Sequence, residues 1–315
     1  MTATGVRCRA ASFSERLPSW DATDAKSAPM PRRAMLSVLA ALLGSACTRT
    51  PRDSPSGAAV RRIVSLTPNT TEALFAIGAG ALLVGRSRYC DWPKEVQSLP
   101  SVGGYVDASF EAILALQPDL VVGARGPAGA GLTDRLQRRG IEIYFPITES
   151  IVGISDMIRG LGQRLGRLER AVEVVSGIEV HLARILQSVG DWPKPRCLMV
   201  FGLSPIVAAA RGSFADEMLV AAGAINVLET GPHYPTLGIE TVIGLAPDVI
   251  IDAAVAEGHG VERIRADRPG WSEVAAVRHG RVLAVDDNAV LRPGPRVADG
   301  VARLAALLHP AGPDR

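Results

Sequence analysis

The sequence has few aromatic residues, few cysteines and no excess of charge of one sign. Aromatic side chains make up 4% of its 315 residues, and the net charge is +2 with acidic and basic residues interspersed. A nucleic-acid-binding protein normally carries a basic stripe, so this balance argues against that class. The four cysteines, Cys8, Cys47, Cys90 and Cys197, include no CxxC pair and no metal-like spacing, so we expect no cysteine-based metal site.

Long apolar runs are also lacking, with one short exception near the start. Residues 30–47, MPRRAMLSVLAALLGSAC, place two arginines before an apolar stretch and small residues before Cys47. The stretch is shorter than the roughly 20 apolar residues of a membrane-spanning helix. It is typical of a secretory signal, and its final cysteine is typical of a lipoprotein signal in which Cys47 becomes lipidated. A plain secretory signal cleaved near Ala46 is the alternative, and residues 1–29 suggest a misassigned start codon with Met30 as the initiator.

A polar segment separates this leader, residues 1–47, from the body of the chain. Residues 48–60 are rich in Pro, Ser and Gly, which predicts a flexible tether. Over residues 61–150, strand-like and helix-like runs alternate, and this pattern predicts parallel βαβ units in a first lobe. The predicted strands are 62–66, 82–87, 119–123 and 141–146, and the predicted helices are 72–79, 109–117 and 131–140.

One phrase of the sequence occurs twice. EAILALQPDLVV (111–122) returns as ETVIGLAPDVII (240–251), with a glutamate at its head and Pro-Asp before branched aliphatic residues. Two further runs, 197–205 and 214–224, repeat the order of 62–68 and 71–81. Three elements that recur in one order predict a second, related α/β lobe, which we place at 195–315; it ends with a strand at 281–286 and a helix at 296–310.

The segment between the lobes, residues 151–190, has apolar residues spaced by three and four, which predicts a helix. Its length corresponds to roughly 50 Å at 1.5 Å per residue, and the glycines Gly160, Gly162, Gly166 and Gly177 allow a kink. We therefore predict an α/β fold of two Rossmann-like lobes joined by one long α-helix, with a cleft between them. Cys90 and Cys197 fall in different lobes, so free thiols are a better expectation than a disulfide.

The chain resembles a known family over about residues 61–310. The pieces that carry the resemblance are RIVSLTPNTTEALFAIGA, SRYCDWPKE, PSVGGYVDASFEAILALQPDLVV, GIETVIGLAPDVII and RPGPRVADGVARLAALLHP. They resemble the substrate-binding proteins of ABC importers that have a helical backbone between their lobes. These proteins serve cobalamin, haem and ferric siderophores, and the chain is most similar to the cobalamin-binding members. The resemblance implies a monomeric, extracytoplasmic protein that captures a corrinoid and delivers it to a permease and its ATPase.

The resemblance also gives the repeated glutamates a role. In the family, a surface glutamate of each lobe docks onto arginines of the permease, and the matching positions are Glu111 and Glu240. Exposed carboxylate–arginine pairs contribute only about 0.2–1 kcal/mol each, so they would set orientation more than affinity. Alternatively, each glutamate only stabilises the first turn of its helix through the helix dipole; both roles can hold together.

Three of the four tyrosines fall in loops that follow predicted strands, where ligands of open α/β sheets bind. Tyr89, Tyr105 and Tyr234 have amphipathic rings that suit a wide, flat ligand. In the cobalamin-binding proteins these loops carry aromatic contacts to the corrin. Trp92 is a weaker candidate, and each of these rings could instead cover a sheet end. Tyr144 lies in a predicted strand and is expected in the core.

Rival ligands and activities stay open at this point. His233, or a tyrosine, could ligate haem iron or cobalt, and arginines near the predicted loops (Arg86, Arg88, Arg125 and Arg211) could hold a ferric siderophore. The five histidines are too scattered for a zinc or manganese receptor. No GxSxG or HExxH motif is present, and residues 123–131 lack the Lys-Ser/Thr of a phosphate loop. We therefore expect neither an enzyme nor a resident cofactor.

Overall fold

The computed structural model describes residues 59–124, 129–254 and 263–310, which belong to one compact unit that begins at Ser56. The predicted leader with Cys47, and all of the predicted tether except its last two residues, lie outside the described residues. Within the described part, no helix is both long and apolar enough to cross a membrane.

The first lobe contains a four-stranded sheet in the order β2-β1-β3-β4, and all of its pairings are parallel. The strands are β1 (Ile63–Ser65), β2 (Leu83–Arg86), β3 (Leu120–Val122) and β4 (Glu142–Tyr144). The helices that connect them are α1 (Pro68–Ala76), α2 (Phe110–Ala115) and α3 (Gly129–Gln137), with two short 3-10 turns at Gly80–Leu82 and Lys94–Ser98. All four predicted strands of this lobe are confirmed.

Helix α1 begins four residues earlier than the sequence predicts. Thr67 occupies the N-cap position in an extended conformation, and Pro68 follows in the first turn, where its fixed φ favours a helix. Glu72 is therefore an interior residue of α1, and it is buried rather than a first-turn anion at the surface.

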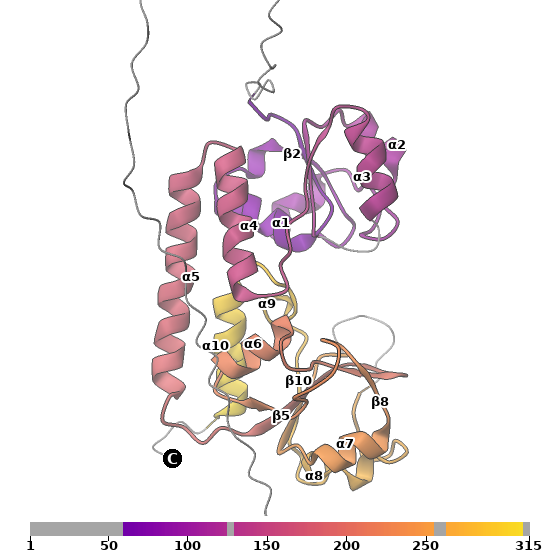
Figure 1. Cartoon of the computed structure of the whole chain (residues 1–315), viewed down its shortest axis with the longest axis vertical. Helices are drawn as coiled ribbons and strands as arrows, with labels where there is room; N and C mark the ends of the chain where they lie inside the picture. Colours follow the sequence, from indigo (N-terminus) through magenta and orange to yellow (C-terminus); the bar gives the residue numbers. More distant parts are fainter. Residues whose placement is uncertain (1–58, 125–128, 255–262, 311–315) are drawn as a thin grey trace, which may run out of the picture. The chain divides into compact units, whose positions relative to one another are not determined.

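The prediction of a single linking helix over residues 151–190 is wrong, because the segment forms two helices. Helix α4 (Ile151–Arg164) ends in a tight turn, and helix α5 (Leu168–Val189) then packs beside it, as Figure 1 shows. Gly166 has a φ of +63°, and the Arg167 N–H donates to the Gly162 carbonyl at 2.7 Å, which is the geometry of a glycine helix stop. A Cβ at Gly162 would overlap the Cβ of Ala171, so a glycine allows this close approach.

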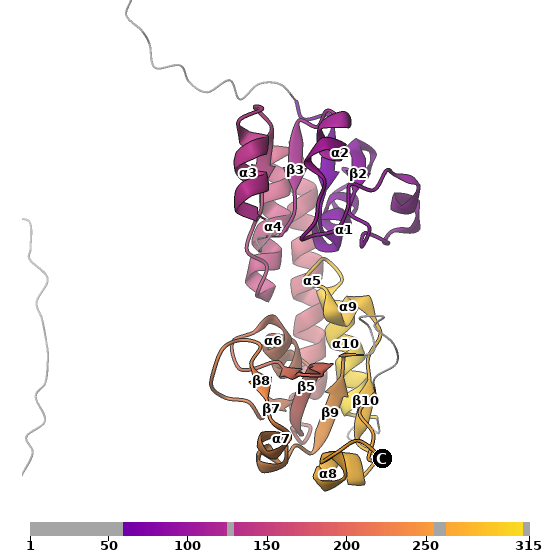
Figure 2. The same ribbon diagram turned by 90° about the vertical axis from the view of Figure 1, so that its right-hand side faces the viewer.

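The second lobe contains a six-stranded, mixed sheet in the order β10-β9-β5-β6-β8, with β7 also paired with β5. The strands are β5 (Arg196–Leu203), β6 (Ile206–Ala208), β7 (Ile225–Asn226), β8 (Thr236–Leu237), β9 (Val249–Asp252) and β10 (Val282–Ala284). The helices are α6 (Phe214–Ala221), α7 (Ile239–Leu245), α8 (Ala275–Arg278), α9 (Asn288–Leu291) and α10 (Val297–Leu308), with a 3-10 turn at Trp271–Glu273. Figure 2 shows α7 and α8 close together in this lobe.

The repeat between the lobes holds for part of their length. Strand β5 corresponds to β1, and the pairs α2–β3 and α7–β9 contain the two copies of the repeated phrase. After β5, however, the chain returns as the antiparallel strand β6 before α6 begins at Phe214. Residues 197–205 therefore repeat 62–68 only as far as the end of the strand.

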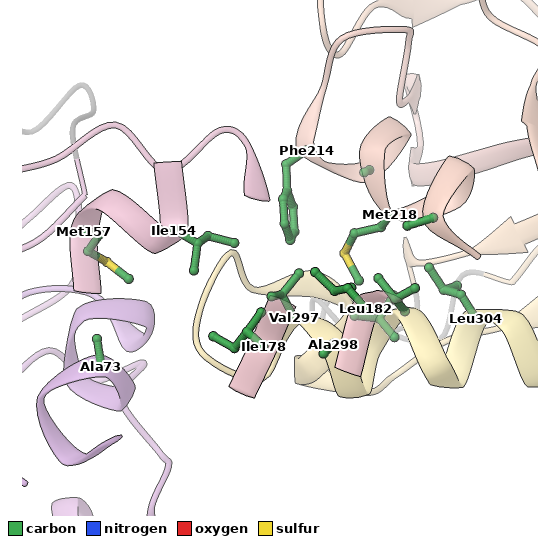
Figure 3. Packing of buried hydrophobic residues seen from close by; sticks show 14 of the residues in the cluster. Ala73, Ile154, Met157, Ile178, Leu182, Phe214, Met218, Val297, Ala298 and Leu304 are labelled. Carbon is green, nitrogen blue, oxygen red and sulfur yellow. The ribbon is translucent and has the colours of Figure 1, made fainter. Parts of the chain in front are cut away.

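Successive side chains of each strand point to opposite faces of its sheet, and one face of each sheet belongs to a shared core. Ile63 and Leu120 of the first sheet, and Met199 and Ile251 of the second, belong to one continuous buried cluster. Helices α1, α4, α5, α6 and α10 complete this cluster, and Figure 3 shows side chains from the two lobes meeting within it. The next residue along each strand faces a separate small core, which α2 and α3 cover in the first lobe and α7 and α8 cover in the second. The predicted α/β class with two lobes is confirmed.

Candidate functional site

The candidate ligand residues lie in loops at the ends of strands, as predicted. Tyr89 and Trp92 follow β2 and are 53% and 47% exposed. Tyr105 lies in the loop before α2 and is partly buried. Tyr234 lies in the loop before β8 and is 39% exposed, and His233 beside it is also exposed. These side chains are thus wholly or partly accessible in loops, whereas Tyr144 in β4 packs against the main core as predicted.

Tyr105 and Tyr234 share an electrostatic neighbour although they come from different lobes. Partial burial raises the pKa of each phenol above its usual value, and the negative charge of Glu149 raises the pKa of both further. Glu149 lies in the loop between β4 and α4 and is exposed. Both phenols therefore stay neutral at physiological pH, and both lie close enough to Glu149 to be influenced by its charge.

The rings of these two tyrosines are also held in place. The Tyr105 hydroxyl donates to the Ala124 carbonyl at 3.4 Å. The Tyr234 ring packs edge-on against Phe201 with ring centroids 5.6 Å apart. A ring with one fixed edge and one free face loses little side-chain entropy when a ligand stacks on it.

His233 contributes its backbone to the local structure. Its carbonyl accepts a hydrogen bond from the Ala210 N–H at 2.9 Å, and its side chain is exposed. No three His, Cys, Asp or Glu side chains within the described ranges come together as metal ligands. The structure thus provides His233 with no partner set for a metal ion among these residues.

The loop 88–92 carries two of the candidate rings, and contacts with α1 and with the loop 103–107 hold it in place. Cys90 is buried, and its sulfur accepts a hydrogen bond from the Thr71 hydroxyl at 3.1 Å. The backbone N–H of Arg88 donates to the Gly103 carbonyl at 2.8 Å, and the Arg88 guanidinium pairs with Asp107. The loop that contains Tyr105 is thus connected to the loop that contains Tyr89.

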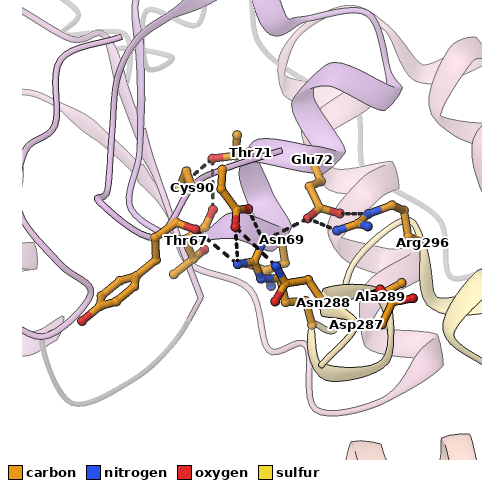
Figure 4. Close-up of polar contacts among 12 residues, drawn as sticks. Thr67, Asn69, Thr71, Glu72, Cys90, Asp287, Asn288, Ala289 and Arg296 are labelled. Carbon is orange, nitrogen blue, oxygen red and sulfur yellow. Dashed lines mark hydrogen bonds and ion pairs between the residues drawn. The ribbon is translucent and has the colours of Figure 1, made fainter. Parts of the chain in front are cut away.

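A charged cluster that sequence reasoning missed lies beside this loop, as Figure 4 shows. Arg292, between α9 and α10, contacts both carboxylate oxygens of Asp91, at 2.5 and 3.1 Å. Arg296 donates two hydrogen bonds of 2.9 Å to Glu72 of α1. Arg292 also lies 3.6 Å from Glu72. The cluster connects the second lobe to the first.

The sequence contains one signal for this cluster. RPGPR (292–296) places two arginines four residues apart just before α10. The acidic partners lie 201 and 224 residues earlier, so sequence spacing could not reveal the pairs.

The repeated glutamates occupy equivalent helix positions. Glu111 lies in the first turn of α2, and Glu240 in the first turn of α7. Glu111 pairs with Arg135 of α3 at 3.2 Å, and its pKa is lowered by backbone hydrogen bonding and by this arginine. Both glutamates are exposed. Their positions are compatible both with helix stabilisation and with docking.

The two described cysteines, Cys90 and Cys197, are free and buried, as expected. Burial raises the pKa of the Cys197 thiol to about 12. The raised pKa keeps Cys197 as the thiol, so it is neither a nucleophile nor a metal ligand in this state, because both reactions require the thiolate. Cys47, the predicted lipidation site, lies outside the described residues.

Comparisons with known proteins agree with this architecture. The chain is 30% identical over 257 residues to an uncharacterised ABC transporter substrate-binding lipoprotein of Bacillus subtilis, covering 79% of this chain and 80% of the relative. The structure is similar to a periplasmic haem-binding protein from Roseiflexus sp. RS-1 (TM-score 0.72, 27% identity, 80% and 98% coverage). It is also similar to the periplasmic vitamin B12-binding protein of Vibrio cholerae (TM-score 0.67, 28% identity, 80% and 98% coverage).

The model of one family matches residues 63–289, which include both sheets, the α4–α5 pair and every candidate ligand residue. With two α/β lobes on a shared core and exposed aromatic loops at the strand ends, the chain belongs to the periplasmic binding protein family.

Proposed function

We propose that the chain is the extracytoplasmic substrate-binding protein of an ABC importer and that it captures cobalamin or a related corrinoid. Membership of the periplasmic binding protein family supports the binding role, as does the similarity to an ABC transporter substrate-binding lipoprotein. The similarity to the vitamin B12-binding protein of Vibrio cholerae supports the ligand class. In this role the chain binds and delivers its ligand and does not transform it.

One observation carries the ligand assignment. Tyr89, Trp92 and Tyr105 from the first lobe, and Tyr234 from the second, keep part of their rings exposed in strand-end loops. Only 4% of the residues are aromatic, so the gathering of four exposed or partly exposed rings in these loops supports a role in ligand binding. Flat apolar faces with hydroxyl groups at their edges suit a macrocycle that has an apolar ring and a polar rim.

The electrostatics of the tyrosines favour a corrinoid over an anionic ligand. A tyrosine that ligates ferric iron does so as a phenolate, but the pKa values of Tyr105 and Tyr234 are raised, which favours the neutral phenol. The negative charge of Glu149 also opposes the carboxylates of haem and of many ferric siderophores. A corrin rim, which carries neutral amides, meets no such repulsion.

Haem is the second candidate, and one observation favours it. The similarity to the haem-binding protein from Roseiflexus is as strong as the similarity to the vitamin B12-binding protein, and His233 lies exposed beside Tyr234. A ferric siderophore is a third ligand of the same class of site. Of the arginines that could hold such a ligand, Arg88 is already paired with Asp107. Arg211 is exposed, and it follows Ala210, whose N–H donates to the His233 carbonyl.

Titration separates these ligands. A soluble version of the chain that begins at Arg52 would be titrated with cyanocobalamin and then with hemin, by calorimetry and absorbance. Sub-micromolar 1:1 binding of cyanocobalamin with weak hemin binding supports the proposal. Tight hemin binding without cobalamin binding would overturn the corrinoid assignment and make His233 and the tyrosines candidate iron ligands.

The remaining parts of the proposal concern partners and location. Glu111 and Glu240 would dock the two lobes onto arginines of a permease that works with its ATPase. Lipidation of Cys47 would hold the monomeric protein at the membrane surface, in the periplasm or at the cell surface. Mass spectrometry of the protein from membranes tests the anchor, because a lipidated Cys47 would be the new N-terminal residue.

A further inference from the structure

The 88–92 loop has unequal support on its two sides. On the inner side, Cys90 is buried against the Thr71 hydroxyl, and its backbone N–H donates to the Ser87 carbonyl at 3.1 Å. On the outer side, the Tyr89 and Trp92 rings are about half exposed. The Arg88 guanidinium lies 5.4 Å from the centre of the Tyr89 ring, and the Gln97 amide donates to the Asp91 carbonyl at 3.1 Å. The most extensive polar contacts of this side are those of the Asp91 carboxylate.

Those polar contacts come from the other lobe. The Asp91 carboxylate receives Arg292 at 2.5 and 3.1 Å and the Asn288 amide at 3.3 Å. Arg292 also donates to the Tyr89 carbonyl at 3.4 Å. The side chain of Arg292 is only 19% exposed, so these charged hydrogen bonds are shielded from water on one side.

Arg296, at the start of α10, contacts the same loop through the Trp92 ring. Its guanidinium lies 5.2 Å from the centre of the Trp92 ring, within the range of a cation–π contact. The same guanidinium is held by both carboxylate oxygens of Glu72, whose side chain is 3% exposed. The buried pair thus fixes the segment 292–296 against α1, and this segment in turn contacts the loop.

We propose that Arg292 is a positioning residue of the ligand site: through Asp91 it holds the 88–92 loop, with Tyr89 and Trp92, in the position that binds ligand. The claim that Arg292 affects ligand binding rests on the proposed function. The claim that Arg292 holds the loop rests only on the contacts described above. It makes the ligand surface of the first lobe depend on a residue of the second. A movement of the lobes relative to each other would therefore move the two rings.

Two variants of the full chain in mild detergent test this role, and hydrogen exchange is the first measurement. Arg292→Gln removes the charge that faces Asp91, and Asp91→Asn removes it from the other side while leaving Glu72 with both arginines. In both variants we expect faster exchange of the amides of residues 88–92, with α1 and α10 unchanged. Arg170→Gln, which removes the exposed pair with Glu173 on α5, is the matched control and should leave the loop unchanged.

Ligand affinity is the second measurement, with cyanocobalamin and hemin as the probes. Loss of a charge-assisted contact costs enough to weaken binding about tenfold, and we expect this loss for both variants. In a Tyr89→Ala/Trp92→Ala background, the same Arg292→Gln change should cause no further loss, because the loop then carries no ring to position. Arg292→Lys should restore part of the affinity.

The two measurements separate the possible failures. Unchanged exchange at residues 88–92 in both variants would overturn the positioning role, whatever the ligand is. An equal loss of affinity with and without the two rings would also overturn it and would indicate direct contact between Arg292 and the ligand. If the parent chain bound neither probe, the proposed function would fail, and the exchange result would still decide whether Arg292 positions the loop.

Discussion

Arg296 donates two hydrogen bonds of 2.9 Å to the carboxylate of Glu72, although 224 residues separate them. The side chain of Glu72 is 3% exposed and that of Arg296 is 25% exposed. The pair connects α1 of the first lobe to the start of α10 in the second. The hydrogen bonds to Glu72 raise the pKa of Arg296, which favours its charged form.

Removing one partner of this pair should destabilise the protein strongly. Glu72→Ala leaves Arg296 partly buried without its counter-charge, and breaking a buried pair in this way costs about 3 kcal/mol. Urea unfolding followed by circular dichroism measures the change. Glu173→Ala removes an exposed partner on α5 and should cost less than about 1 kcal/mol. Equal effects of the two substitutions would contradict the prediction.

Two glycines in the helical pair should respond in opposite directions to alanine. Gly177→Ala in α5 places a methyl group in open space and should stabilise the protein by roughly 0.5–1 kcal/mol through helix propensity. Gly162→Ala in α4 gains the same propensity, but its Cβ would overlap that of Ala171 and force α4 and α5 apart. We therefore expect a net loss of stability in thermal unfolding. A gain at both positions would contradict the close packing of the two helices.

The Asp91–Arg292 contact should make stability depend on pH in the acidic range. The Arg292 hydrogen bond holds the pKa of Asp91 below its usual 3.8. A carboxyl group with a lowered pKa in the folded state stabilises the protein above its unfolded pKa, and this contribution disappears as the pH falls through the folded pKa. Unfolding free energies measured from pH 7 to pH 3 should show wild type more stable than Asp91→Asn near neutrality, with the difference shrinking below about pH 4. A constant difference would mean that the charge on Asp91 is not what stabilises the contact.

The docking proposal predicts a separation between binding and transport. Glu111→Ala with Glu240→Ala should leave ligand affinity intact, because both side chains are exposed in the first turns of α2 and α7 and neither belongs to the candidate ligand residues. The same double variant should abolish stimulation of the reconstituted transporter. Glu169→Ala with Glu173→Ala on α5 is the control and should leave transport unchanged. Normal uptake by the docking variant would remove the role of these glutamates.

The shared core predicts a small movement of the lobes. One buried cluster includes residues of both sheets, and the Ile151 N–H at the start of α4 donates to Glu217 of α6 at 2.7 Å. Opening by a large angle would expose this core, so we expect ligand binding to cause a hinge or twist of only a few degrees. Small-angle scattering with and without ligand tests this. A large compaction on binding would contradict it.

The sequence predicts local features of this protein well and distant pairings poorly. Short runs of branched aliphatic residues located the strands of the first lobe, and the repeated phrase placed Glu111 and Glu240 in equivalent first turns. The α4–α5 turn was missed because the apolar spacing continues across it, and only Gly166 marks the stop. Strand β6 was missed because its short run, Ile206–Ala208, is flanked by other small apolar residues.

For the candidate site, sequence reasoning found the loop positions of the tyrosines but not the contacts around them. Tyr89, Tyr105 and Tyr234 could be located because tyrosine is rare here and loops have recognisable residues around them. Arg292 and Asp91 could not be paired, because only the folded chain brings them together. Nor could Glu149 be recognised, since its influence on two tyrosines depends on where β4 ends.

The labelling rates of the two buried thiols report two different opening motions. A chain that begins at Arg52 contains only Cys90 and Cys197, and both are buried, so an alkylating reagent reaches each thiol only when the structure around it opens. Cys90 is the buried residue of the 88–92 loop, so its labelling rate records how often that loop leaves its place against α1. Cys197 lies within β5 at the centre of the second sheet, so its labelling rate records the opening of that whole sheet.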